Sequence, residues 1–201
     1  MAFEFAFKTI RDLSSGLSRK DFSPTELLAG VVARYEELEP RLNMFVHTDF
    51  EGARRQAEAS EARILSGSKL GELDGIPTSI KDLIAVKDMP MRAGSRATPD
   101  ANQTEDAPSV ERLRAAGAVI LGKSTTSEFG CKAVGDSQLT GITRNPWNTD
   151  LTPGGSSCGA AAHSGGAHGT VWHQGQFRAG GCISNIGYAN SGACRALNAQ
   201  C

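Results

Sequence analysis

The chain has 201 residues, of which 39% are hydrophobic and 21% are charged, and its formal net charge is -1. These values are typical of one globular domain, and the small charge gives no electrostatic reason to expect nucleic acid or an anionic membrane as a partner. No apolar run approaches the roughly 20 residues of a membrane span. The N-terminus carries an early acid, Glu4, instead of the cationic start of a signal peptide. The sequence predicts a cytoplasmic protein that binds neither nucleic acid directly nor a membrane.

Cysteine and histidine are concentrated toward the end of the chain. The cysteine count is odd, at 5, and no Cys-x-x-Cys pair occurs, which argues against a disulfide framework and a structural zinc site. His163, His168 and His173 are spaced five residues apart, and this spacing does not align them on one helical face. We therefore expect neither a metal nor a cofactor.

Two helices are predicted near the N-terminus. Residues 8–20 carry apolar side chains at helical spacing. A second helix begins after Ser23, which is a good N-cap, with Pro24 in the first helical position and Glu26 completing a capping box. Its apolar stripe is expected to end at Pro40.

The next segments alternate between strand and helix. Residues 43–48 read as a strand, and Asp49 can cap a third helix that continues to about Leu65. A further helix is expected from Pro108 to Gly117, directly before an apolar strand at 118–123. This rhythm predicts an α/β fold.

A lysine and two serines could carry chemistry. Lys81 lies in an apolar run at 75–83, where burying an ammonium requires a nearby acid or a function. Lys81 could equally well pair with Asp82 or extend its ammonium into solvent, and neither arrangement would require a catalytic function. Ser156 and Ser157 follow two glycines in a turn, and serine with lysine is sufficient for acyl transfer if the fold joins them.

Five ordered blocks carry a specific resemblance. They occupy residues 75–82, 116–123, 128–131, 141–147 and 153–157. Together they resemble the amidase signature family. The resemblance implies an α/β/α layered fold around a large mixed sheet. It also implies a Ser–Ser–Lys triad that hydrolyses small-molecule amides through a seryl acyl-enzyme.

The resemblance also implies roles for individual residues. Lys81 matches the base, and Ser156 matches the serine that follows a cis peptide and relays the proton. Ser157 matches a supporting hydrogen-bonding serine, while Gly154 and Gly155 supply backbone freedom to the turn. A lysine with a reference pKa near 10.4 becomes a useful base at neutral pH only when burial lowers that pKa by roughly two to three units.

The family pattern breaks after Ser157. The nucleophile serine is expected about two dozen residues after Ser156, where this chain has Gly180. The nearest similar segment, residues 180–184, offers Cys182 in place of a serine, so no nucleophile serine is identifiable and Cys182 is a substitute only. Glycines and histidines after Ala162 also predict that the alanine-rich helix of the family does not form.

These departures predict a division of the chain. Residues 1–157 form the N-terminal part of a single, truncated amidase domain, and residues 158–201 form an atypical tail that is frameshifted or disordered. No Asp or Glu follows Asp150, and the chain is short for the family. We therefore expect an amidase that is impaired or inactive in this form.

Two alternatives stay open. The first is the A subunit of a glutamyl-tRNA(Gln)/aspartyl-tRNA(Asn) amidotransferase, which would need partner subunits, whereas a free-standing amidase could form a homodimer. The second is a non-catalytic fragment.

Overall fold

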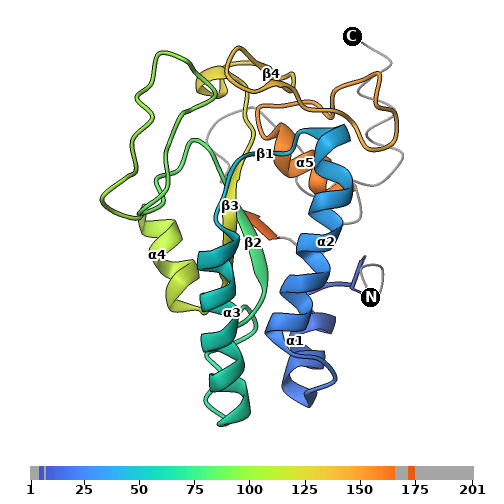
Figure 1. Ribbon diagram of the computed structural model, residues 1–201, viewed down its shortest axis with the longest axis vertical. Coiled ribbons are helices and arrows are strands. Elements are labelled where there is room, and N and C mark those ends of the chain that lie inside the picture. The colour runs from blue at the N-terminus through green and yellow to red at the C-terminus, as the bar shows by residue number, and fades with distance from the viewer. Residues whose placement is uncertain (1–4, 7, 166–171, 175–201) are drawn as a thin grey trace.

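The computed structural model describes residues 5–6, 8–165 and 172–174. Among them, two helical layers enclose a mixed sheet (Figure 1). The strand order is β1 (Phe45–Thr48), β3 (Val119–Ser124), β2 (Pro77–Lys81) and β6 (Trp172–Gln174). β1 runs antiparallel to β3, while β2 is parallel to both β3 and β6. The predicted α/β/α class is confirmed.

Both predicted N-terminal helices are present, and the second begins at its predicted cap. α1 (Ile10–Arg19) follows Thr9, and α2 (Pro24–Leu42) follows the capping box of Ser23 and Glu26. The predicted end of α2 at Pro40 is wrong. Pro40 removes one backbone N–H and crowds the preceding turn, but α2 continues past it to Leu42. The helix instead closes at Asn43, which has a left-handed φ of 52° and donates its N–H to Glu39 O at 2.9 Å.

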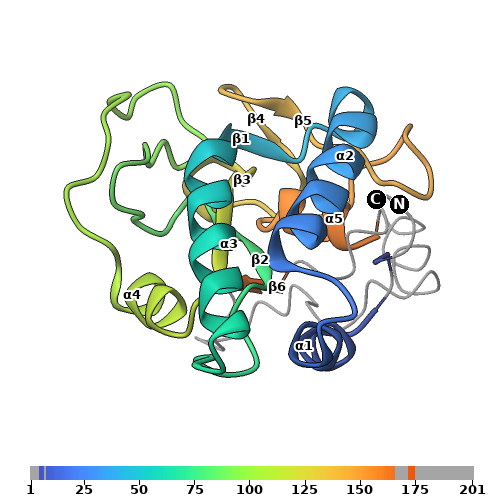
Figure 2. The ribbon, with the colours of Figure 1, turned by 60° about the horizontal axis from the view of Figure 1, so that its bottom comes forward.

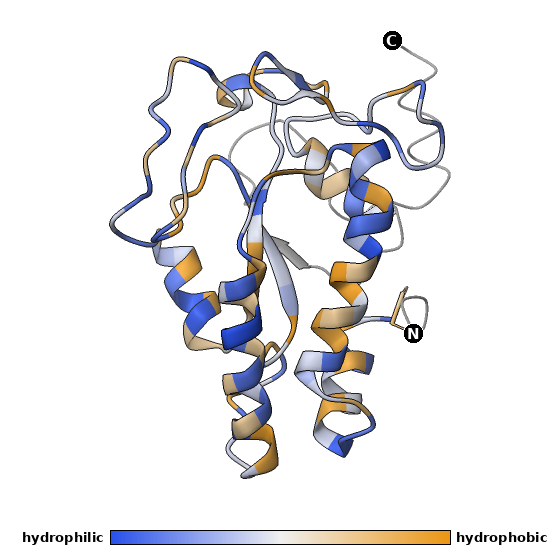
Figure 3. Ribbon diagram, viewed as in Figure 1, coloured by the Kyte–Doolittle hydropathy of each residue, from blue (hydrophilic) through white to orange (hydrophobic). Residues whose placement is uncertain are grey.

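Apolar side chains separate the sheet from both helical layers. α1, α2 and α3 (Phe50–Leu65) cover one face, and α2 and α3 lie side by side there (Figure 2). α4 (Pro108–Ala115) covers the other face. The apolar segments of these helices are orange in Figure 3. The two cores are built around Leu13, Leu17, Leu27, Ile76, Val119 and Leu121 on the first face, and around Ile80, Val110, Leu113 and Ile120 on the second.

The segment after β3 leads back toward the sheet. It contains a short 3₁₀ helix, η1 (Glu128–Gly130), and a two-stranded sheet of β4 (Asp136–Ser137) and β5 (Gly141–Ile142). A glycine-rich turn then enters α5 (Cys158–Gly165). Within the described part of the chain, none of the helices has the length and apolar character that crossing a bilayer would require.

The expectation that no helix follows Ser157 is wrong. α5 buries Ala162 against Leu38 and Leu42 of α2 and against Met44. Three consecutive alanines favour a helix, and this packing outweighs the low propensities of the glycines and the histidine. The division of the chain at residue 157 stays a prediction, because residues 166–171 and 175–201 lie outside the described residues.

Candidate active site

Lys81 and Ser156 lie together at the C-terminal end of β2. Lys81 is the last residue of this strand and is buried, with an exposed fraction of 5%. Its Nζ donates a hydrogen bond to Ser156 Oγ at 2.6 Å. The sheet brings together two residues that are 75 positions apart in the sequence. The spatial arrangement therefore provides a lysine–serine pair that can exchange a proton.

The turn that carries Ser156 is fixed by its backbone. The Gly155–Ser156 peptide bond is cis, and Gly154 has a left-handed φ of 84°. Ser127, which follows β3, donates its N–H to Ser156 O at 3.3 Å. Ser157 is buried, and its carbonyl oxygen accepts the N–H of Ala161 at 3.0 Å inside α5. The start of α5 and the segment that follows β3 thus hold the turn from both sides.

A second lysine is buried on the opposite face of the sheet. Lys123 Nζ forms an ion pair with Asp82 Oδ1 at 3.1 Å and also donates to Pro90 O at 3.1 Å. Burial lowers the pKa of Lys123, although the charge of Asp82 acts to raise it. Asp82 also accepts the N–H groups of Arg92 and Gly94. The sequence suggested that Asp82 pairs with Lys81, but in the structure Asp82 forms an ion pair with Lys123.

One histidine, which the sequence suggested only as a metal ligand, lies beside the lysine–serine pair. His163 of α5 is buried, and its Nε2 lies 2.9 Å from Ser79 Oγ. Its ring stacks on Phe45, with the ring centroids 5.6 Å apart. Ser79 lies two residues before Lys81, so both share one face of β2. The alternation of side chains along β2 could have indicated Ser79 from the sequence. The position of His163 could not be inferred, because it depends on α5, which the sequence did not predict.

Several predicted site residues lie outside the described residues. These are Cys182 and the remainder of its segment, Gly180, Gly181, Ile183 and Ser184, together with His168. Only the backbone of His173 is described, in β6. Within the ranges that the structure covers, no three His, Cys, Asp or Glu side chains gather closely enough to hold a metal ion.

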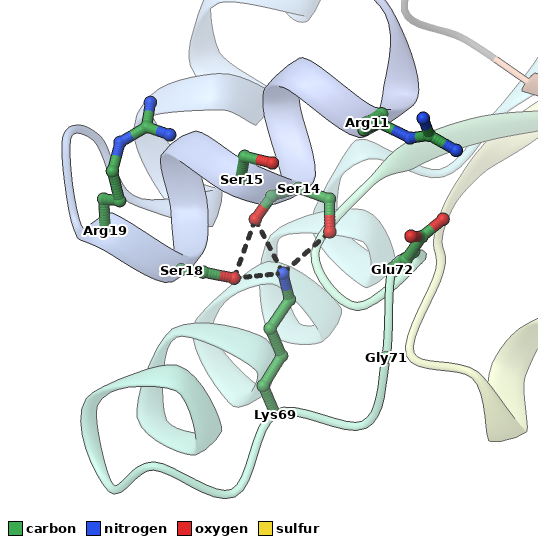
Figure 4. A pocket seen from close by; sticks show the side chains of 8 residues that line it. All are labelled: Arg11, Ser14, Ser15, Ser18, Arg19, Lys69, Gly71 and Glu72. Carbon is green, nitrogen blue, oxygen red and sulfur yellow. Dashed lines mark hydrogen bonds between the residues drawn. The ribbon is translucent and has the colours of Figure 1, made fainter.

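Two cavities occur away from the lysine–serine pair. One, of about 490 Å³, lies between α1 and the loop after α3 (Figure 4). There Lys69 Nζ donates to the carbonyl oxygen and hydroxyl of Ser14 and to Ser18 Oγ, and burial lowers the pKa of Lys69. The other, of about 370 Å³, is lined by residues of β1 and by Asp82 and Arg92. Neither cavity includes Lys81 or Ser156 among its lining residues.

Comparison with known sequences identifies the family. The family model described as Amidase matches residues 26–170, which is more than half of the chain. The chain belongs to the amidase family. The amidase match includes β2, the turn that contains Ser156, and all of α5.

Individual relatives agree with this assignment. The A subunit of the glutamyl-tRNA(Gln) amidotransferase of Methylococcus capsulatus is 43% identical over 155 residues, which cover 77% of this chain and 32% of that protein. Its counterpart in Azotobacter vinelandii, which has the same name, is 42% identical, again over 77% of this chain and 32% of the relative. This amidase-family chain therefore spans about a third of the length of the curated relatives that it matches.

Solved structures show the same fold. The native peptide amidase of Stenotrophomonas maltophilia is 32% identical, with a TM-score of 0.76, and the match covers 81% of this chain and 35% of that one. A bacterial aryl acylamidase of the amidase signature family is 28% identical, with a TM-score of 0.73 over 80% of this chain and 34% of that one. The described residues thus form part of an amidase-signature fold.

Proposed function

We propose that this chain carries the base and the relay serine of a site that hydrolyses carboxylic amides. The hydrogen bond of 2.6 Å between Lys81 Nζ and Ser156 Oγ carries the proposal. In this scheme a nucleophile serine attacks the amide carbonyl and gives its proton to Ser156, while Ser156 passes its own proton to Lys81. The resulting acyl-enzyme is hydrolysed by water, which releases the acid after ammonia or an amine has departed.

The supporting residues have structural roles in the same scheme. Gly155 allows the turn to approach the loop at Val134 closely, Gly154 takes the left-handed backbone conformation, and Ser157 links the turn to α5. Backbone N–H groups next to the nucleophile would stabilise the oxyanion. The nucleophile serine is not assigned to a residue, and Cys182 remains a substitute candidate only.

We propose that the 201-residue chain by itself has little or no amidase activity. A fluorophosphonate probe, which labels activated serines, is the direct test, with Ser156→Ala and Lys81→Met as controls for labelling that depends on the site. Stoichiometric labelling of the wild-type chain would overturn this proposal. Labelling by an iodoacetamide probe that disappears in Cys182→Ala, together with amide hydrolysis, would instead favour the thiol substitute.

A second candidate function is that of the A subunit in a tRNA-dependent amidotransferase. It is favoured by the names of the relatives that are 43% and 42% identical to this chain. In this proposal the chain acts in the cytoplasm with partner subunits, and its substrate is a small amide. Coexpression with tagged B- and C-type subunits tests the assembly, because a free-standing amidase or its homodimer would not be retained by them.

The third candidate is a non-catalytic fragment, which the absence of a serine at the expected nucleophile position, Gly180, favours. Reading the gene in its two other frames tests the frameshift, since a recovered nucleophile segment would locate it. Circular dichroism and a melting curve test whether the chain folds. A truncated sheet with open strand edges is expected to melt early or to aggregate.

A further inference from the structure

A buried serine at the end of β3 is not accounted for by the fold or by the proposed site. The side chain of Ser124 is fully buried, and none of the described residues offers its Oγ a hydrogen-bond partner. Its backbone is engaged, because Ser124 O accepts the N–H of Asp82 at 3.1 Å. A buried hydroxyl without a partner costs free energy, since the lost water is not replaced. Such a group beside a chemical site therefore needs an explanation.

The register of the sheet places Ser124 next to Lys81. The two residues are paired in the parallel ladder of β2 and β3, and Phe45 is paired with Ser124 from the other side. Paired residues on neighbouring strands project to the same face. Phe45 stacks on His163 of α5, so this is the face that α5 covers. Ser124 thus lies between Phe45 and Lys81, on the face from which Lys81 reaches Ser156.

The neighbouring lysine does not explain this hydroxyl. Lys123 is paired with Ile80, which belongs to the core under α4, so its side chain lies on the other face. There it binds Asp82 and Pro90. Ser124 is left with Lys81 as the closest functional group in the register of the sheet.

We propose that Ser124 is a positioning residue for Lys81, whose ammonium donates a hydrogen bond to Ser124 Oγ once the lysine has taken the proton of Ser156. This inference rests on the proposed function. In the step, the O–H bond of Ser156 breaks, its electron pair stays on the oxygen, and a new N–H bond forms on Lys81. Ser124 keeps its own proton throughout. An ammonium has three donors, and rotation of Ser124 between its staggered rotamers can turn Oγ toward one of them.

The hydrogen bond from Lys81 to Ser124 changes the pH range over which Lys81 is charged. An acceptor that binds only the ammonium stabilises it and raises the pKa of the lysine. The substitution Ser124→Ala removes the acceptor without changing the other titratable groups on the elements packed around the end of β2. Among the described residues these groups include Asp82, Lys123, Glu128 of η1, Arg92, Glu39 of α2, and Cys158 and His163 of α5.

The test is an NMR titration of the full chain labelled with ¹³C at the lysine ε carbons. The Lys81 signal is assigned by its loss in Lys81→Arg. We expect Ser124→Ala to lower the pKa of Lys81 by about one unit, because a hydrogen bond to a charged group is lost. Ser124→Thr keeps a hydroxyl and is expected to retain the wild-type value. An unchanged or raised pKa in Ser124→Ala overturns the inference.

Melting temperatures distinguish a role of Ser124 in positioning Lys81 from a purely structural role. Because the hydroxyl of Ser124 has no partner among the described residues, Ser124→Ala should melt at the wild-type temperature or above it at a pH above the pKa of Lys81, where the lysine is neutral and the proposed contact contributes no stability. Ser60→Ala is the matched control, since Ser60 is equally buried but lies in α3, and it should leave the Lys81 titration unchanged. A lower melting temperature for Ser124→Ala without a change in the titration would show a structural role and contradict the inference.

The wild-type titration tests the proposed function independently. A Lys81 that titrates near 10.4, as an exposed lysine does, argues against its role as the base. A lowered wild-type pKa that does not respond to Ser124→Ala overturns the positioning role alone.

Discussion

Lys123 Nζ and Asp82 Oδ1 lie 3.1 Å apart, and the side chains of both residues are almost completely excluded from solvent. Desolvation makes either charge costly when it is alone, while the pair compensates both. The carboxylate of Asp82 also accepts two backbone N–H groups, from Arg92 and Gly94. This ion pair therefore joins the end of β3 to the loop that follows β2.

Breaking this pair from one side should be strongly destabilising. We expect Asp82→Asn and Lys123→Met each to lower the free energy of unfolding by about 3–5 kcal/mol, because each leaves a buried group uncompensated. The double variant should lose less than the sum of the two single variants. Urea denaturation of the four proteins measures this coupling.

An exposed pair provides the control. Lys132 and Asp136 lie 3.4 Å apart with about half of each side chain exposed. Asp136→Asn should change the free energy of unfolding by less than about 1 kcal/mol. Equal losses for Asp82→Asn and Asp136→Asn would contradict the assigned role of burial.

The two glycines of the turn should respond differently to alanine. A Cβ at Gly155 would overlap the carbonyl of Val134, coming within 2.8 Å of its carbon atom, and backbone cannot move aside as a flexible side chain can. We expect Gly155→Ala to cost more than about 2 kcal/mol or to prevent folding. Gly154 has a left-handed φ of 84°, but the nearest atom to its added Cβ is 3.8 Å away. Gly154→Ala should therefore cost only about 1 kcal/mol, from the backbone conformation.

Melting curves of the two variants, recorded under one condition, compare these costs directly. If Gly154→Ala were the more damaging substitution, the close approach at Val134 would not be what restricts the turn to glycine.

Local chemistry was readable from the sequence where the determining residues are close together. The capping box of Ser23 and Glu26 uses atoms within one turn of helix, and α2 begins where the sequence places it. The neighbourhood of Lys81 and Ser156 is different in kind, because it depends on the whole fold. It could be anticipated only through the resemblance to a family.

Contacts that depend on the register of the strands could not be predicted from the sequence. The pairing of β2 with β3 is irregular between Thr78 and Ile80, and this irregularity puts Lys123 on the face of Ile80 and leaves Ser124 on that of Lys81. A strict alternation along β3 would have exchanged the two faces. The helix α5 was missed for another reason, since packing on Leu38 and Leu42 offsets the low helix propensities of its glycines and histidine.

Acid should weaken the fold through Asp74. This carboxylate is buried, which by itself raises its pKa, but hydrogen bonds from Arg63 and from the backbone of Leu70 outweigh burial, so the pKa of Asp74 lies below the ordinary 3.8. A carboxyl whose pKa is lowered by folding contributes stability above the unfolded value of 3.8 and loses it as the pH falls through the folded value.

The comparison with Asp74→Asn isolates this contribution. Between pH 7 and pH 4 the wild type should be the more stable protein, and the difference should shrink below pH 4, by an amount on the order of 1 kcal/mol. Urea denaturation at several pH values provides the measurement. A difference that stays constant down to pH 2 would show that Asp74 acts by its shape and not by its charge.

Glu39 should show the opposite dependence on pH. Burial raises its pKa above the ordinary 4.5, although the N–H groups of Phe45 and Met44 donate to its carboxylate and act to lower it. A carboxyl with a raised pKa contributes stability that is fully present below 4.5 and is lost as the pH rises through the folded value. Relative to Glu39→Gln, the wild-type chain should therefore lose stability as the pH rises from 4 toward neutrality, in the range where the Asp74 contribution is constant. Unfolding curves of Glu39→Gln and Asp74→Asn in the same buffers compare the two slopes, and slopes of equal sign would contradict the opposite effects of burial and hydrogen bonding at these two carboxyls.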